Sequence, residues 1–358
     1  MQKRVTKIFI IVFIALISIP FIFVILQIKV TPVNKQEKKI SLNFKRNFPL
    51  RSDLFKMYSL GKTTFFDAEP IPNGVVDAKN GWRFLGNKFS NALSESKGLI
   101  TFNQKELSKI AKNLSEKKEW LDKKNIKFYF SIAPNKHTIY GDMIPIKKSH
   151  RKTKFEQLDS ICQSLGINFI DLGSNFPKND SLRLYHKTDS HWNHYGAFYA
   201  YNSTLEAIMP DFKGVDFNYR TMKDMEVEKF WAHIGDLNRA LFLEQNEEFI
   251  NVKPIKPFSF TAQEKTLTVP LNYHFGDHFY EERYKSPANE LKIMVLRDSF
   301  FGAYFESIAD SFGESLFIWR HNFNKKLIES EKPDILCYEL VERNIDILLT
   351  ENFNHSPN

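Results

Sequence analysis

A histidine with an aspartate two residues before it is the first group in this sequence that could do chemistry. Residues 188–193 read Thr-Asp-Ser-His-Trp-Asn and precede a segment, 195–209, with helical periodicity. In an extended segment, residues i and i+2 point to the same side. Asp189 can therefore hold one imidazole nitrogen of His191 and leave the other free to act as a base. The alternative is that Asp189 or Asn193 only caps the helix.

A serine at a predicted strand-to-helix junction is the second such group. Ser299 follows an apolar run, 292–296, and precedes a segment, 300–312, that we expect to be helical. This position lifts a nucleophile to the carboxyl edge of a sheet, where the helix start can supply N–H donors to an oxyanion. Alone, Asp298 or Ser299 could be a helix cap. Together with Asp189 and His191, Ser299 predicts nucleophilic catalysis.

A metal site is the competing interpretation of the histidine-rich segment. His186, Asp189, His191 and His194 lie close together in the sequence. Their spacing matches no standard zinc motif, and a helix would not place them on one face. We therefore predict no metal site and no cofactor.

The elements around these residues alternate between apolar runs and helical segments. We expect a helix at 154–165 and strands in the apolar runs, which are 127–133, 167–172, 292–296, 315–319 and 335–340. Continuous apolar runs between helices favour a parallel sheet covered on both faces, which is a doubly wound α/β domain. Residues 211–290 show no clean period, and we expect an insertion or loops that cover the site.

The amino-terminal region predicts a membrane anchor. Residues 8–28 form an almost unbroken apolar run without charge, preceded by Lys3, Arg4 and Lys7. As a helix this run is about 30 Å long, which matches a bilayer core. Because no small-residue cleavage site follows, we expect 1–29 to be an uncleaved anchor with a basic flank. A polar linker at 30–48 then leads to an α/β domain at 49–358 on the extracytoplasmic side.

The charge balance of the chain indicates which classes of partner it could bind. Lys and Arg outnumber Asp and Glu by 50 to 42, a net charge of +8 that suits a lipid surface or an acidic polymer. The charge is too diffuse to indicate nucleic acid. The two cysteines, Cys162 and Cys337, lie in apolar stretches. We expect buried free thiols, and a disulfide between them remains open.

The order of these motifs resembles a known family. Asp-x-His-Trp followed much later by strand, Asp-Ser-Phe and helix is similar to the SGNH hydrolase-like family of the alginate O-acetylation proteins, AlgJ and AlgX. Looser similarities lie in Asn80–Leu85, in Ile132–Lys136 with Tyr140 and Pro145, in Gly235–Leu237 and in Glu339–Arg343. The resemblance covers roughly residues 75–345.

The resemblance implies a flavodoxin-like parallel sheet and a role for each matching residue. Ser299 matches the nucleophile, His191 the general base and Asp189 the residue that orients it, in a permuted order relative to ordinary SGNH esterases. Arg297 stands where family members often have glycine, and could crowd an acyl donor or bind an anionic substrate. The other candidates for lining a sugar site, each of which could equally be structural, are Asn135, Lys136, Trp192 and Arg343.

The activity that this resemblance implies is O-acetyl transfer to a cell-surface or secreted polysaccharide through an acyl-serine. The acyl donor would arrive through a membrane-bound O-acyltransferase partner, on the periplasmic side of the inner membrane. A carbohydrate esterase would use the same three residues with water as the acceptor. A non-catalytic assembly protein of a polysaccharide complex is the third interpretation.

Overall fold

A computed structural model describes most of the chain after residue 73. The described ranges are 74–144, 146–178, 180–233, 235–263, 281–319 and 323–350, with isolated positions before them. The chain divides into two compact units, residues 1–70 with 241–243, and residues 71–240 with 244–358. The sheet and the helices given below belong to the second unit, apart from the last residue of α9.

The second unit is built on one mixed sheet. Among the described residues it has seven strands, in the order β4-β3-β11-β9-β10-β8-β7. The first five of these are parallel, and β8 and β7 are added antiparallel at one edge. In spatial order the strands are β4 (Asn168–Asp171), β3 (Lys127–Ala133), β11 (Ile335–Val341), β9 (Lys292–Leu296), β10 (Glu314–Ile318), β8 (Glu281–Lys285) and β7 (Thr261–Ala262).

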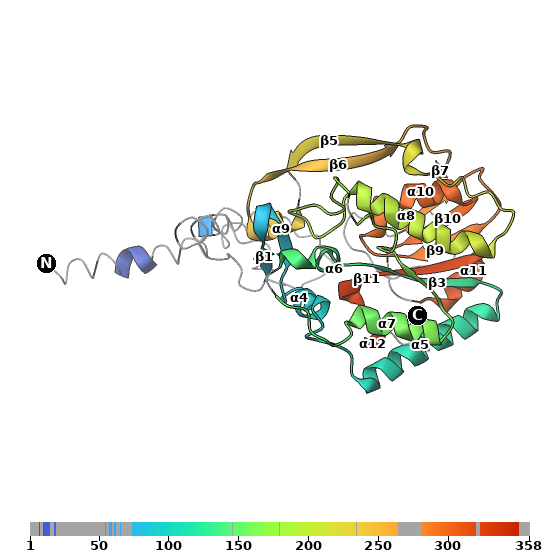
Figure 1. The fold of residues 1–358 in the computed structure, drawn as a ribbon, viewed down its shortest axis with the longest axis horizontal. Helices are drawn as coiled ribbons and strands as arrows, with labels where there is room; N and C mark the ends of the chain where they lie inside the picture. The colour runs from blue at the N-terminus through green and yellow to red at the C-terminus, as the bar shows by residue number, and fades with distance from the viewer. Residues whose placement is uncertain are drawn as a thin grey trace, which may run out of the picture. The chain divides into compact units, whose positions relative to one another are not determined.

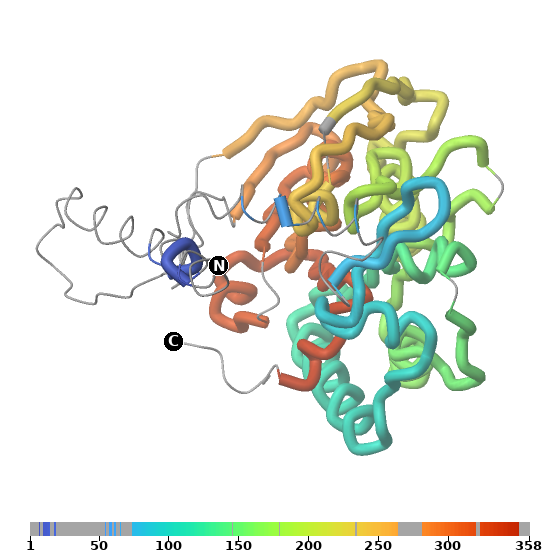
Figure 2. Tube along the Cα trace, turned by 90° about the vertical axis from the view of Figure 1, so that its left-hand side faces the viewer, coloured from blue at the N-terminus to red at the C-terminus, as the bar shows by residue number. Residues whose placement is uncertain are grey.

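Helices cover both faces of this sheet, which explains why its central parallel strands β3, β11, β9 and β10 read as continuous apolar runs. Along β9, Ile293 and Val295 pack into one buried cluster, while Met294 and Leu296 pack into the other. The first cluster contains α8 (His194–Ile208) and α10 (Phe305–Ser311). The second contains α5 (Gln104–Asp122), α7 (Lys154–Ser164), α11 (Lys325–Glu331) and α12 (Ile347–Thr350). Figure 1 shows α5 and α8 on opposite sides of the sheet, and the two segments also lie apart in the tube view of Figure 2.

Smaller elements complete the unit. The strands β1 (Val75–Asp77) and β2 (Arg83–Leu85) form a hairpin, and β5 (Met225–His233) pairs antiparallel with β6 (Asn246–Pro254) in a separate ribbon (Figure 1). The short helices are α4 (Ala92–Ser96), α6 (Lys136–Ile139) and α9 (Asp236–Leu241). One-turn 3-10 helices lie at Lys79–Gly81, Gly141–Met143, Met209–Asp211, Met222–Asp224, Phe301–Ala303 and Glu342–Asn344.

Side-chain caps fix where the helices begin. Asn103 with Glu106, and Thr153 with Glu156, form capping boxes at the starts of α5 and α7. The side chain of Asn193 accepts the N–H groups of Tyr195 and Gly196 at the start of α8. Asn193 is therefore a helix cap, and it fixes the start of α8 directly after the His-Trp pair.

The α/β architecture and its principal strands are confirmed, with two corrections. The expected helix at 300–312 is interrupted, because a 3-10 turn at Phe301–Ala303 precedes α10. The segment 211–290, expected to be irregular, supplies β5, β6, β7 and β8, and two of these strands extend the main sheet. The 19-residue helix α5 was not among the elements expected from the sequence.

The predicted anchor and linker fall largely outside the described residues. Of the anchor, only the isolated positions Lys7, 10–14 and Ser18 are described, and none of the linker at 30–48. Among the residues that the structure describes, no helix has both the length and the apolar character to cross a membrane.

The expectation of buried free thiols is confirmed for Cys162 and Cys337. They belong to different hydrophobic clusters, on opposite faces of the sheet. Because of this separation, the two cysteines do not form a disulfide in the described structure.

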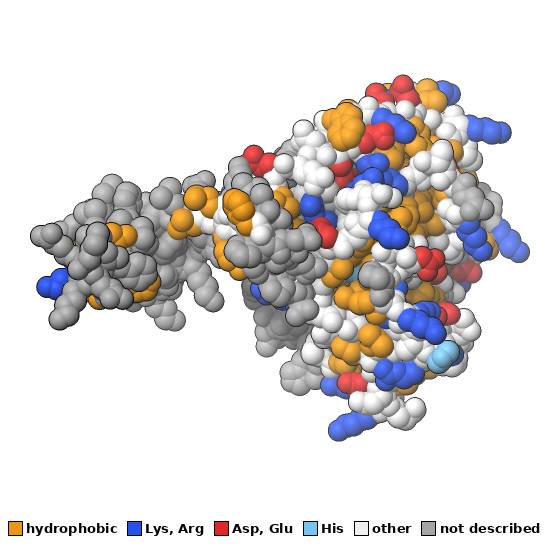
Figure 3. Space-filling view, turned by 60° about the vertical axis from the view of Figure 1, so that its left-hand side comes forward, with side chains coloured by type: hydrophobic (Ala, Val, Ile, Leu, Met, Phe, Trp, Pro, Cys, Tyr) orange, Lys and Arg blue, Asp and Glu red, His pale blue; other side chains and the backbone are white. Residues whose placement is uncertain are grey.

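Charged side chains are spread over the surface rather than gathered. Figure 3 shows lysines and arginines in small groups, interspersed with acidic and apolar side chains over the described part of that face. The view agrees with the diffuse positive charge of the sequence.

Candidate active site

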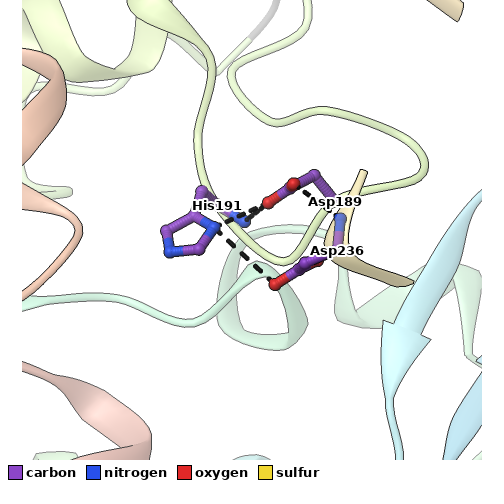
Figure 4. Close-up of side chains that lie close together, drawn as sticks. All are labelled: Asp189, His191 and Asp236. Carbon is purple, nitrogen blue, oxygen red and sulfur yellow. Dashed lines mark hydrogen bonds and ion pairs between the residues drawn. The ribbon is translucent and has the colours of Figure 1, made fainter. Parts of the chain in front are cut away.

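The residues Asp189, His191 and Ser299 meet in one chain of hydrogen bonds. His191 Nδ1 lies 2.6 Å from Asp189 Oδ1, which also accepts the backbone N–H of His191 at 2.9 Å (Figure 4). On the other side of the ring, His191 Nε2 lies 2.8 Å from Ser299 Oγ. All three residues are partly exposed, so a reacting group can approach them from solvent. This arrangement can remove a proton from the serine hydroxyl.

The turn that carries Ser299 is fixed to the neighbouring strand through Asp298. One carboxylate oxygen of Asp298 accepts the N–H of Phe300 at 2.8 Å, and the other accepts the N–H of Val341 at 2.6 Å. Asp298 therefore ties the end of β9 to the end of β11. Of the two residues that could have been caps, Asp298 has the structural role, and the hydroxyl of Ser299 faces His191.

A second carboxyl group lies beneath the same turn. Glu339, fully buried on β11, accepts the backbone N–H of Asp298 at 2.8 Å. Burial, together with the charge of Asp298, raises the pKa of Glu339 well above its usual range. A neutral Glu339 can support the turn without adding a second full charge beside Asp298.

Lys136 holds the loop that carries Asp189. Its ammonium group donates to the carbonyl oxygens of His186, Lys187 and Asp189 at 2.9, 3.1 and 2.7 Å. Lys136 is 2% exposed, and burial lowers its pKa to about 7 against the opposing charges of Asp189 and Glu247. Of the two roles that the sequence left open for Lys136, a sugar contact and a structural role, these contacts favour the structural one, because the carbonyl groups occupy its donors.

Glu247, on β6, holds the same loop from its N–H side. One carboxylate oxygen accepts the N–H of Thr188 at 2.7 Å, and the other accepts the N–H of Lys187 at 3.1 Å and lies 3.2 Å from His186 Nδ1. Although burial opposes it, hydrogen bonds from His186 and Thr188 lower the pKa of Glu247 to about 2. Sequence reasoning missed Glu247, because it lies in the segment that was expected to be irregular.

Trp192 and Arg297 are also engaged within the protein. Trp192 is 2% exposed, and its Nε1–H donates to the carbonyl of Phe300 at 3.0 Å. The buried guanidinium of Arg297 lies 3.1 Å from Glu282 and stacks over the ring of Trp319 at 4.8 Å. These contacts favour a structural role for both residues: Trp192 joins the two halves of the site, and Arg297 makes an ion pair, although its buried Nε meets no acceptor among the described residues.

Asn135 and Arg343, at the same edge of the sheet as Ser299, make fewer side-chain hydrogen bonds than Lys136. The Asn135 backbone N–H donates to Glu342 at 2.8 Å, while its side-chain Nδ2 is buried and meets no acceptor among the described residues. Arg343 is half-buried, lies 3.4 Å from Asn135 Oδ1 and sits 5.1 Å from the ring centre of Phe300. Asn135 and Arg343 therefore retain side-chain donors at the carboxyl edge of the sheet, as does the Nε of Arg297.

The histidine-rich segment does not converge on one point. His186 faces Glu247, and His194 Nδ1 lies 2.5 Å from Asn251 Oδ1. Among the described residues, Asp189, His191 and Asp236 do lie close enough to hold a metal ion. Their ligand atoms are engaged in hydrogen bonds with one another and with the intervening Ser190, so a metal would have to displace these bonds.

A pH dependence of stability follows from Glu342, which accepts the Asn135 N–H. Burial raises its pKa from 4.5 to about 7. The folded protein therefore keeps this proton to about pH 7, whereas the unfolded chain releases it near pH 4.5. The contribution of Glu342, up to about 3 kcal/mol, is present below pH 4.5 and is lost as pH rises through about 7.

Glu342→Gln tests this dependence, because glutamine keeps an acceptor for Asn135 and cannot titrate. Melting temperatures of both proteins across this pH window should converge at the acidic end, and the wild type should fall below the variant at the alkaline end. Parallel curves would show that Glu342 does not carry the proton.

The fold and this geometry define the class of the protein. The strands β3, β9 and β11 are parallel, and Asn135, Ser299 and Arg343 follow their carboxyl ends at one edge of the sheet. A mainly parallel α/β sheet with a hydrogen-bonded Ser, His and Asp at that edge is typical of SGNH hydrolase-like proteins.

The family follows from the sequence match. A family model described as "SGNH hydrolase-like domain, acetyltransferase AlgX" matches residues 75–273. The chain belongs to this family. No curated protein sequence matches it significantly.

Several solved structures share the fold at low sequence identity. Bacillus cereus PatB1 with a sulfonyl adduct is 18% identical with a TM-score of 0.59, covering 78% of this chain and 100% of that chain. A second structure of Bacillus cereus PatB1 is 19% identical with a TM-score of 0.56, covering 75% of this chain and 96% of that chain. A DHHW family protein from Eubacterium siraeum is 15% identical with a TM-score of 0.53, covering 79% and 97%.

Proposed function

We propose that this protein transfers an acetyl group through Ser299 to a hydroxyl group of a cell-surface or secreted polysaccharide. The observation that carries the proposal is the hydrogen-bonded chain from Asp189 through His191 to Ser299. Membership of the acetyltransferase AlgX family supports acetyl as the acyl group.

The reaction has two half-steps that use the same histidine. In the first, His191 Nε2 accepts the proton of Ser299 Oγ as this oxygen attacks the acetyl carbonyl of the donor. The donor alcohol leaves with that proton, and acetyl-Ser299 remains. In the second, a sugar hydroxyl gives its proton to His191 while its oxygen attacks the ester. The proton then returns to Ser299 as the acetylated sugar departs.

Asp189 and Asn135 support the charges that develop in these steps. Burial would raise the pKa of Asp189, but the hydrogen bonds and charge of His191 hold it below its usual range. Asp189 therefore stays ionised and stabilises the imidazolium. We assign Nδ2 of Asn135 as a donor to the oxyanion, because it meets no acceptor among the described residues. The same side chain accepts from Arg343 at 3.4 Å, and Arg343 lies over the ring of Phe300, the residue after Ser299.

The candidate cavity for a sugar acceptor is lined by β6 and by the segment that follows Ser299, and Asp189, His191 and Ser299 are not among its lining residues. It has a volume of about 310 Å³ and lies between β6 and residues 302–307, which begin three positions after Ser299. Its lining combines aromatic rings with polar groups, including Phe258, Phe305, Asn251 and Glu306. Apolar walls with a few placed polar groups are typical of small-ligand sites.

The donor and the location complete the proposal. We propose that the apolar run 8–28 anchors the protein in the inner membrane, with the second unit on the periplasmic side. A membrane-bound O-acyltransferase partner would then present the acyl group to Ser299. The basis for this partner is the family resemblance together with the apolar run.

Trapping the intermediate tests the proposal. The purified protein is incubated with an activated acetyl ester, and the peptide that contains Ser299 is examined by mass spectrometry. We expect one added acetyl group on Ser299 and none in His191→Ala. Since a sulfonyl adduct has been obtained with PatB1, a sulfonyl fluoride is a second probe, and we expect it to label Ser299 as well.

An oligosaccharide acceptor separates the alternatives. Acetylated sugar supports transfer, whereas release of acetate without acetylated sugar supports the esterase. An unlabelled Ser299 under both probes, with polymer acetylation fully restored by Ser299→Ala in a deletion strain, favours a non-catalytic assembly protein.

A further inference from the structure

A second carboxylate, Asp236, lies against the loop that holds His191. Its backbone N–H donates to Asp189 Oδ2 at 2.8 Å. Its side chain accepts the N–H and the hydroxyl of Ser190 at 2.7 and 2.5 Å. One of its oxygens also lies 3.8 Å from His191 Nδ1 (Figure 4). Asp236 thus contacts each residue of the Asp-Ser-His segment.

The backbone around Asp236 docks on the same loop independently of its side chain. The N–H groups of Leu237 and Asn238 both donate to the carbonyl of Thr188, at 3.2 and 3.3 Å. Gly235 has a φ of +113°, and a Cβ there would collide with this carbonyl group. A substitution that changes only the Asp236 carboxylate should therefore leave the docking intact.

We infer that Asp236 is a positioning residue for His191, and that its charge stabilises the imidazolium formed when Ser299 loses its proton. It acts by fixing Ser190 and Asp189 and by placing a second negative charge beside Nδ1. The inference rests on the proposed function, because it assigns Asp236 a part in that same proton transfer.

The charges around His191 support this assignment. Asp189 contacts Nδ1 from the same loop, Asp236 faces it from α9, and Ser299 contacts Nε2 from the turn after β9. The ring of Phe300 packs on the imidazole with centroids 4.8 Å apart.

Further charged groups contact the neighbours of His191 rather than its ring. Lys136 contacts the Asp189 carbonyl, Glu247 the N–H of Thr188, and Arg343 the ring of Phe300. Among the described side chains, those that face Nδ1 are therefore the two carboxylates of Asp189 and Asp236.

Asp236→Asn and Asp236→Ala distinguish the effect of the Asp236 charge on His191 from its effect on the position of the loop. Asparagine keeps an oxygen acceptor for Ser190 but removes the charge, so the acid side of the pH–rate profile should move by about one pH unit to lower pH. Its kcat/KM at neutral pH should fall by about tenfold. Alanine also removes the acceptor, so its kcat/KM should fall by about 10²-fold.

The experiment measures kcat/KM of the full chain for an activated acetyl ester from about pH 5 to about pH 9. Asp122→Asn, at the exposed end of α5, is the matched control and should behave as the wild type. An acid limb of Asp236→Asn that coincides with that of the wild type overturns the role of charge. An Asp236→Ala variant with wild-type kcat/KM overturns the role in positioning.

Two further results distinguish a failure of the proposed function from a failure of the role given to Asp236. A wild type that forms no acetyl-Ser299 refutes the proposed function itself, whereas a labelled wild type with unaffected Asp236 variants refutes only this inference. Loss of wild-type activity with a chelator, restored by a divalent cation, would make Asp189, His191 and Asp236 metal ligands and would overturn it as well.

Discussion

Ser299→Ala is expected to lower the turnover of an activated acetyl ester by about 10³- to 10⁶-fold. Ser299 Oγ lies 2.8 Å from His191 Nε2, and alanine leaves the histidine without an atom to activate. The loss should appear in kcat rather than in KM, because the hydroxyl reacts but does not hold the donor in place.

The fold should survive this substitution. Ser299 is partly exposed, and its turn is fixed by the carboxylate of Asp298 rather than by its own side chain. We expect a melting temperature within about 2 °C of the wild type. Ser164→Ala, at the exposed end of α7, is the control. A Ser299→Ala protein that keeps more than about a tenth of the turnover would contradict the nucleophile assignment.

Lys136→Met is expected to damage both stability and activity. Methionine fills a similar volume but leaves the carbonyl groups of His186, Lys187 and Asp189 without their donor. Unpaired buried carbonyls should cost about 3 kcal/mol, which lowers the melting temperature by about 5 to 10 °C. Since Asp189 then loses its support, kcat/KM should fall by about 10²-fold.

The pH dependence of this variant gives a separate readout. The pKa of Lys136 is lowered from 10.5 to about 7 in the folded protein. The unfolded chain therefore binds more protons between these values, so the contribution of Lys136 to stability rises with pH from about 7 to 10.5. Lys136→Met should lack this rise.

Thermal denaturation over that pH range measures the effect, with the partly exposed Lys118→Met on α5 as the control. A variant as stable and as active as the wild type would refute the support of the loop by Lys136.

The reacting residues were the part of the site that the sequence could predict. Asp189 and His191 are two residues apart, so their contact is local, and Ser299 follows an apolar run that is clearly a strand. The supporting residues were harder to find. Asp236 and Glu247 contact Ser190 and Thr188 across 46 and 59 positions of the chain. No local pattern encodes such pairs.

Lys136 shows why residue type alone leaves open the choice between a sugar contact and a structural role. A lysine after a strand at the carboxyl edge can face a ligand or a loop, and the sequence is the same in both cases. The structure buries it near Trp82 and Phe84, whose ring centres lie 5.5 and 5.2 Å from its ammonium group. Packing by these distant aromatic residues therefore decided its orientation.

The strands between 211 and 290 were missed because their residues are charged and only partly buried. β8 reads Glu-Glu-Arg-Tyr-Lys, which resembles a solvent-exposed segment. In the structure Arg283 is nevertheless 8% exposed and lies 2.8 Å from Glu331. Because Arg283 is buried through an ion pair with a distant helix, β8 lacks the alternation of apolar residues by which a strand is recognised in a sequence.

The hydrogen bonds that hold the loop at 186–190 also affect which molecule can receive the acetyl group. Lys136 takes the carbonyl groups of this loop, while Glu247 and Asp236 take its N–H groups. Because these backbone groups are already hydrogen-bonded within the protein, they cannot bind and order a water molecule beside an acetyl group on Ser299. For the proposed reaction, fewer ordered waters beside the ester would slow its hydrolysis and favour attack by a sugar hydroxyl.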